Sequence, residues 1–203
     1  MSNPSSLAYG TGGISAFCRA ATVVLLVLSA ASCTPARLVG EPLPSPIAPS
    51  FTLVDGPTGD TVSLSSLPGQ VVLVTFLYTS CPDICPLTAE TLREAHAALG
   101  DAARGLTLIA VSVDPVHDTP DATRRFLEDH RLQGVLRYLI GSRAQLAQVW
   151  NQYGVLQAAG TGAVAHTDVI YLIDKHARGR VVLHSDVSAD VLASDLRILI
   201  SER

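Results

Sequence analysis

The stretch VVLVTFLYTSCPDICPLTAETL, residues 71–92, contains the change of pattern that decides the fold. Residues 71–78 form a continuous apolar run, which is typical of a strand buried on both faces. Beyond Pro86, apolar residues recur at helical spacing up to Leu99, and Gly100 ends the predicted helix. Cys81 and Cys85 lie at the junction of the two patterns. The junction raises the question whether the two thiols form a disulfide switch, a metal clamp or both.

The elements on either side of this stretch complete one α/β domain. A second buried strand at 106–113 gives a strand–helix–strand unit, which is right-handed and parallel. The remaining predicted elements are a hairpin at 51–54 and 61–67, a helix from Pro120 to about His130, a strand at 137–140, a helix capped by Ser142 and Gln145, a hairpin at 168–174 and 180–186, and a last helix opened by Ser188. This order predicts a single-domain α/β protein with a thioredoxin-like fold and an additional N-terminal β-hairpin.

The composition excludes some classes of partner. The chain has 203 residues, of which 48% are hydrophobic and 16% charged, and its formal net charge is -4. It contains no basic tract of the kind that follows a phosphate backbone, so we expect no nucleic-acid partner.

The N-terminal region predicts export. Arg19 is followed by AATVVLLVLSAASC, an uncharged run too short for a comfortable membrane span but suited to a signal peptide. The small residues before Cys33 are similar to the cleavage box of bacterial lipoproteins, although Ala30 stands where that box usually carries leucine. We therefore expect a lipoprotein signal at 1–32 and a lipidated Cys33. Simple secretion and an uncleaved anchor are the alternatives.

Residues 33–49 contain five prolines and no periodicity, which predicts an extended tether before a domain at 50–203. With Cys18 removed and Cys33 lipidated, Cys81 and Cys85 are the thiols left in the mature domain. A disulfide that closes so small a loop constrains the unfolded chain little. The pair therefore requires a chemical explanation, although a purely structural disulfide is the simpler reading outside the cytoplasm.

The topology brings further side chains to the cysteines. In such sheets the sites lie beyond the carboxyl ends of the parallel strands, where Cys81 and Asp114 follow their strands. If 168–174 runs antiparallel, the loop before it delivers His166 to the same edge. Two thiolates and one imidazole suit Cu(I) and tolerate Cu(II), whereas structural zinc would require a fourth protein ligand. A core histidine at 166 and a turn-forming role for Asp114 are the plainer interpretations.

The positions of the prolines bear on whether Cys81 and Cys85 act in dithiol exchange. Thioredoxin-like oxidoreductases place a cis-proline just before the strand that faces their cysteine pair, and this chain has no proline after Pro120. Ala165 and His166 occupy that position. This argues against general dithiol exchange as the only function.

Three motifs carry a family resemblance. FLYTSCPDICPLTAETL, VSVDPVHDTPDA and HTDVIYLID resemble the motifs of the Sco/SenC copper proteins, and the resemblance covers residues 50–203. It implies one copper ion per chain, Cu(I) or Cu(II), bound by Cys81, Cys85 and His166. It also matches Asp114 to an acidic residue near the site, for which we expect a supporting or partner-facing role.

The resemblance also implies partners and a location. We expect a metallochaperone that delivers or helps insert copper into the copper A centre in subunit II of cytochrome c oxidase. Other periplasmic copper carriers are further expected partners, and the anchored chain would face outward from the bacterial cytoplasmic membrane. The alternative is a thiol-disulfide oxidoreductase that keeps the cysteines of subunit II reduced or signals redox and copper stress through redox-active Cys81 and Cys85.

Overall fold

The computed structural model describes residues 37–44, 47–159 and 164–202, and the side chains of residues 157–159 and 164–166 lie outside the description. The expected signal peptide at 1–32, Cys18 and the lipidation site Cys33 also lie outside the described residues. Within the described part, no helix is long and apolar enough to cross a membrane.

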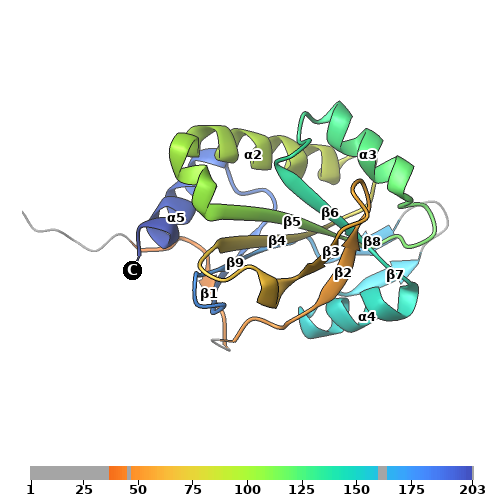
Figure 1. The fold of residues 1–203 in the computed structure, drawn as a ribbon, viewed down its shortest axis with the longest axis horizontal. Helices are drawn as coiled ribbons and strands as arrows, with labels where there is room; N and C mark the ends of the chain where they lie inside the picture. Colours follow the sequence, from red (N-terminus) through yellow and green to blue (C-terminus); the bar gives the residue numbers. More distant parts are fainter. Residues whose placement is uncertain (1–36, 45–46, 160–163, 203) are drawn as a thin grey trace, which may run out of the picture. The chain divides into compact units, whose positions relative to one another are not determined.

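The described residues form one α/β unit (Figure 1). Its strands are β1 (Glu41–Pro42), β2 (Thr52–Asp55), β3 (Thr61–Ser63), β4 (Val71–Leu77), β5 (Leu106–Ser112), β6 (Leu136–Ile140), β7 (Gln157–Ala159), β8 (Val164–His166), β9 (Val169–Ile173) and β10 (Gly179–His184). Its helices are α2 (Ile84–Leu99), α3 (Pro120–Asp129), α4 (Arg143–Gln152) and α5 (Ala189–Ser201), with short 3-10 turns η1 (Leu64–Ser66) and η2 (Gly100–Gly105).

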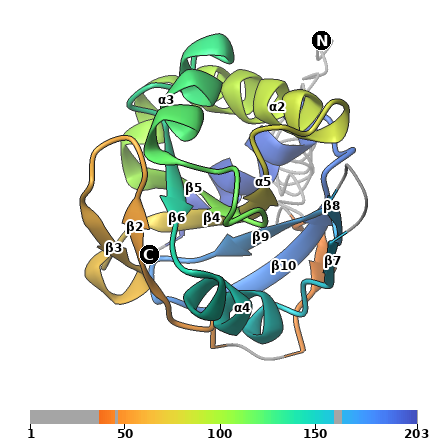
Figure 2. The ribbon, with the colours of Figure 1, turned by 90° about the vertical axis from the view of Figure 1, so that its right-hand side faces the viewer.

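The main sheet has the order β1-β10-β9-β4-β5-β6-β2-β3. Strand β4 is parallel to β5, and β5 is parallel to β6, as the strand–helix–strand pattern predicts. Strand β9 runs antiparallel to β4, with Thr75 opposite Ile170. The end of β4 therefore meets the start of β9 at one edge of the sheet, which faces the viewer in Figure 2.

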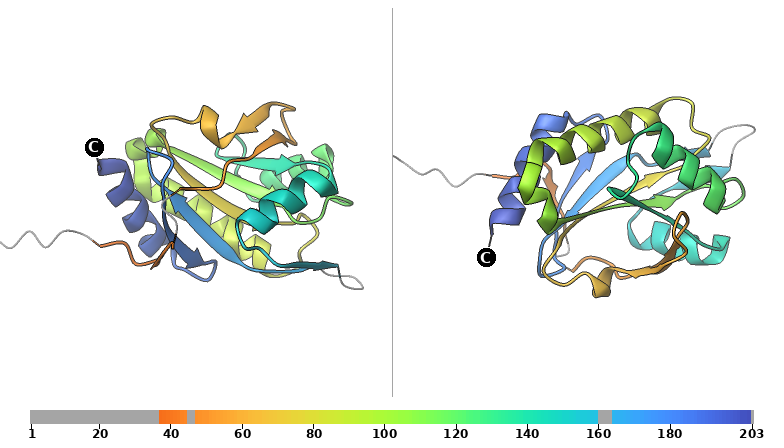
Figure 3. Two further views of the ribbon diagram at one scale, coloured as in Figure 1. Left: turned by 90° about the horizontal axis from the view of Figure 1, so that it is seen from below. Right: turned by 45° about the horizontal axis from the view of Figure 1, so that its top comes forward.

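Helices cover both faces of this sheet. Helices α2, α3 and α5 lie on one face and α4 lies on the other (Figures 1 and 3). Every residue of β4 is buried, which explains its unbroken apolar run. Trp150 reaches from α4 to donate its indole N–H to the carbonyl oxygen of Ser112 at 3.0 Å, so α4 fixes the end of β5.

Local sequence signals set the helix ends. Gly100 ends α2 with a φ of 54°, a value that glycine adopts without strain. The hydroxyl of Thr119 accepts from the amide of Ala122 at the start of α3. Ser142 and Gln145 form the predicted capping box of α4, and the Ser188 hydroxyl caps α5.

The proline-rich segment before residue 50 differs from the prediction. The compact unit begins at Arg37, and β1 pairs with β10. Asp195 of α5 accepts hydrogen bonds from the backbone amides of Val39 and Gly40. Much of the predicted tether is therefore held on the domain, because its backbone amides find buried acceptors that a sequence pattern does not reveal.

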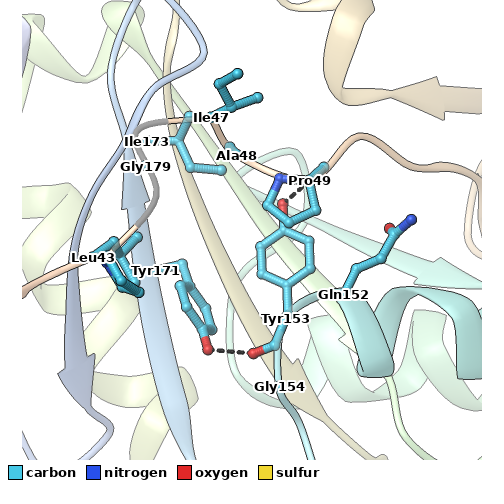
Figure 4. Close-up of a pocket in the computed structure, with 11 residues that line it drawn as sticks. Leu43, Ile47, Ala48, Pro49, Gln152, Tyr153, Gly154, Tyr171, Ile173 and Gly179 are labelled. Atoms are coloured by element: carbon cyan, nitrogen blue, oxygen red, sulfur yellow. Dashed lines mark hydrogen bonds between the residues drawn. The ribbon is translucent and has the colours of Figure 1, made fainter.

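A cavity of about 470 Å³ lies beneath this segment (Figure 4). Tyr153 donates its hydroxyl to the carbonyl oxygen of Pro49 at 2.9 Å, and Tyr171 donates to the carbonyl oxygen of Tyr153. The lining is mostly apolar and includes neither Cys81 nor Cys85. The cavity thus belongs to the packing of the N-terminal segment and not to the thiols.

Candidate metal centre

The two cysteines lie where β4 gives way to α2. Cys81 lies in the connection, and Cys85 lies in the first turn of α2. Pro86 is also in this first turn. Backbone N–H groups there have no partner within the helix, so a proline, which has no N–H, is tolerated. Both cysteines are free thiols, with Cys81 8% and Cys85 0% exposed. The backbone amide of Cys85 donates to the Cys81 sulfur at 3.5 Å.

The surroundings of the two thiols differ. Burial tends to raise the pKa of Cys81, but hydrogen bonds from the backbone amides of Asp83 and Cys85 outweigh it and lower the pKa below its ordinary value. Burial raises the pKa of Cys85, and the Cys81 thiol and the charge of Asp168 add to the rise. Cys81 is therefore the thiol that more readily becomes a thiolate, the form that attacks disulfides and binds metals.

This asymmetry predicts an order of alkylation. In the folded, reduced chain at pH 7, Cys81 is expected to react with iodoacetamide at least about ten times faster than Cys85, because it is the more exposed thiol and the more ionised one. Quenched time points and mass spectrometry of the peptides measure the two rates. In urea the rates should converge. Equal rates in the folded chain would contradict the assignment.

The backbone of His166 reaches the same edge as the cysteines. His166 ends β8, three residues before β9 begins, and β9 starts beside the end of β4. The expectation that His166 lies in a loop was wrong: β8 pairs with β7, with His166 opposite Gln157. This second hairpin was missed because its strands have three residues each, too few for a periodic pattern.

The structure does not describe the His166 side chain, so its role as a ligand stays a prediction. Among the described side chains, no three His, Cys, Asp or Glu residues form a group that could hold a metal ion. The described thiols thus provide two of the three expected donors. Soft sulfur donors of this kind suit Cu(I).

Asp114 lies in the connection after β5, as expected from the sequence. Its carboxylate accepts from the amides of Val116 and His117 and lies 2.7 Å from Nδ1 of His117. The His117 side chain is 68% exposed, whereas that of Asp114 is nearly buried. Asp114 therefore orders its own turn and orients an exposed imidazole. A role toward the thiols or a partner stays a prediction.

Sequence reasoning missed two carboxylates near the thiols. Asp168, two residues after His166, accepts from the hydroxyl of Ser185, and its other oxygen, Oδ1, is buried with no hydrogen-bond partner among the described atoms. Asp118 is 4% exposed, and burial raises its pKa against the opposing hydrogen bonds of Ser112 and Thr79. The one sequence signal that could have indicated Asp168 as a site residue is its position as an acidic residue at the start of an apolar strand. Nothing in VDPVHDTP marks Asp118 as buried.

A helix that begins with a thiol pair and follows a central parallel strand, beside an antiparallel hairpin and a closing helix, defines a thioredoxin-like domain. The hairpin β2–β3 is its predicted extra element. The family model of SCO1/SenC matches residues 40–201, and the chain belongs to this family.

Individual relatives agree with the family assignment. A SCO2-like protein of Rickettsia typhi is 27% identical over 158 residues, which cover 74% of this chain and 76% of the relative. The structure of Bradyrhizobium japonicum ScoI with copper bound is 32% identical, with a TM-score of 0.67 and coverage of 75% of this chain and 99% of that one. Apo Sco1 of Thermus thermophilus is 29% identical, with a TM-score of 0.69 and coverage of 81% and 98%.

Proposed function

We propose that this chain binds one copper ion through Cys81, Cys85 and His166 and acts as a metallochaperone. Its client would be the copper A centre in subunit II of cytochrome c oxidase. The observation that carries the proposal is the pair of free thiols at the start of α2, at the edge of the sheet where β9, the strand that follows His166, begins. The 32% identity to Bradyrhizobium japonicum ScoI, a protein solved with copper bound, supports copper as the metal.

The residues present fit copper chemically. The pKa of Cys81 is lowered and that of Cys85 is raised, and metal binding would displace the protons of both thiols, so affinity would rise with pH. A bound copper would supply a soft cation that offsets the two thiolate charges. A Cys81–Cys85 disulfide has no thiolate to offer, and oxidation therefore would abolish this ligand set.

Metal content of the purified chain tests the proposal. The reduced chain is expected to retain one Cu(I) per molecule after desalting, and the oxidised chain is expected to lose Cu(I) binding. Elemental analysis with a thiol titration measures both values. A reduced chain that retains no copper would contradict the copper function.

A second candidate function is thiol-disulfide exchange with the cysteines of subunit II. The unequal thiols favour it, since a thiol with a lowered pKa next to a fully buried thiol with a raised pKa suits attack followed by resolution. Cys81 would attack the client disulfide to form a mixed disulfide, and Cys85 would release the client. Two electrons and two protons pass to the client, and Cys81 and Cys85 become a disulfide. This function requires no copper, so the metal measurement separates it from the first.

We also propose that Cys33 is lipidated and anchors the domain on the outer face of the cytoplasmic membrane. The support is the short apolar run and the small residues that precede Cys33. Mass spectrometry of the mature N-terminus tests it. A free Thr34 or a retained Arg19 would contradict it.

A further inference from the structure

Asp118 is a buried carboxylate on which donors from three elements converge. One oxygen, Oδ1, accepts from the backbone amide of Thr79 at 2.8 Å and from the Thr79 hydroxyl at 2.7 Å. The other, Oδ2, accepts from the hydroxyl of Ser112 at 2.6 Å and that of Tyr138 at 3.3 Å. A buried charge costs several kcal/mol of desolvation unless such donors offset it. The hydrogen bonds of Asp118 therefore link β5 and β6 to the segment before Cys81.

The two oxygens face different parts of the molecule. Ser112 and Tyr138, on Oδ2, belong to the sheet. Thr79, on Oδ1, lies two residues before Cys81 in the connection between β4 and α2. The amide of Cys81 donates to the carbonyl oxygen of Tyr78 at 3.3 Å, so the backbone turns sharply between Thr79 and the thiol. The two hydrogen bonds to Oδ1 hold Thr79, at the start of this turn, in place.

Asp118 also fixes the neighbouring connection. Its amide donates to the carbonyl oxygen of Asp114 at 3.0 Å, and the amide of Asp114 donates to the Ser112 hydroxyl at 3.1 Å. The connections after β4 and after β5 thus share one carboxylate. Groups that orient metal ligands through hydrogen bonds typically change metal affinity when they are removed.

We propose that Asp118 is a positioning residue of the thiol pair. Its Oδ1 holds the Thr79 peptide so that the Cys81 sulfur stays against the first amides of α2. This deepens the proposed function and rests on it for the metal, although the same placement governs the redox equilibrium of the pair. In the reduced state the backbone amide of Cys85 donates to the Cys81 sulfur at 3.5 Å, and loss of this contact would favour the disulfide.

A matched control separates positioning from a merely structural role. Asp195 is also a fully buried carboxylate, and it too accepts from backbone amides, those of Val39 and Gly40. It lies on α5, which is on the opposite side of the domain from the connections that follow β4 and β5 (Figure 1). Asp195→Asn and Asp118→Asn each replace a buried, hydrogen-bonded carboxylate with an amide, so both are expected to lower stability.

The test compares the full chain with Asp118→Asn, Thr79→Val and Asp195→Asn. Cu(I) affinity is measured by competition with a chromophoric chelator, and the Cys81–Cys85 equilibrium is measured in glutathione buffers. Asp118→Asn is expected to lower Cu(I) affinity about tenfold, within the range found for groups that orient metal ligands. Thr79→Val removes the hydrogen bond from the hydroxyl to Asp118 and keeps the one from the backbone amide, so we expect a smaller loss of Cu(I) affinity. Both variants should shift the redox equilibrium several-fold toward the disulfide, and Asp195→Asn should change neither value.

Each outcome decides the matter. If Asp118→Asn and Thr79→Val match Asp195→Asn in affinity and in redox equilibrium, the positioning role is overturned and Asp118 is structural. If Asp118→Asn does not fold, Thr79→Val alone decides. If the unaltered chain binds no copper but the redox equilibrium responds to Asp118→Asn and Thr79→Val, the copper function fails and the positioning role stands.

Discussion

The His166→Ala chain is expected to bind Cu(I) on the order of 100-fold more weakly than the unaltered chain, a larger loss than the roughly tenfold one expected for Asp118→Asn. The change would leave two thiolates and remove the expected nitrogen donor. Disulfide exchange is expected to persist, because it requires only the two sulfur atoms. Chelator competition under anaerobic conditions measures the affinity, and reduction of a model disulfide measures the exchange.

A second histidine provides the control for this experiment. His176 is exposed in the turn between β9 and β10, at the other end of β9 from His166. His176→Ala should bind copper like the unaltered chain. If His166→Ala also bound copper normally, the three-ligand hypothesis would be wrong. An oxidase assembly assay with His166→Ala in cells would then show which activity the cell requires.

The Leu73→Ala chain is expected to lose about 2–5 kcal/mol of its free energy of unfolding, the usual cost of removing a buried leucine side chain. Leu73 lies in the central strand β4, is fully buried, and stands between Leu108 of β5 and Leu172 of β9. The substitution leaves a cavity that rigid neighbouring strands cannot fill. Urea unfolding followed by the fluorescence of Trp150, the single tryptophan, measures the loss.

Leu87→Ala is the matched control, since it removes the same atoms from a position that is 62% exposed. It should change the free energy of unfolding by no more than about 0.5 kcal/mol, as is usual for surface substitutions. Similar losses for the two variants would mean that β4 is not the centre of the core.

Several elements of the fold were predictable from local sequence. The apolar run of β4 and the helical spacing after it gave the order of strand, thiol pair and helix, and Gly100, Ser142 and Ser188 set helix ends where the structure has them. The parallel pairing of β4 with β5 followed from chain connectivity. Short elements escaped prediction. Strand β1 has two residues and depends on its partner β10.

The candidate site was predictable only in part. Cys81 and Cys85 are close along the chain, and their spacing alone placed them at one helix start. The expected antiparallel direction of β9 placed the chain at His166 at the same edge of the sheet as the cysteines. The burial of Asp118 and Asp168 was not predictable, because it depends on residues far away in the sequence, such as Thr79 for Asp118 and Ser185 for Asp168.

The sequence by itself therefore determined the succession of elements and the position of the thiol pair, since periodicity, capping and spacing act over a few residues. Only the tertiary structure decided that the segment before β1 is held by Asp195, that Cys81 and Cys85 have opposite tendencies to ionise, and that Asp118 joins two connections. These features depend on which distant groups share a buried volume. Burial makes an unpaired polar group costly, and so folding brings such groups together with donors from elsewhere in the chain.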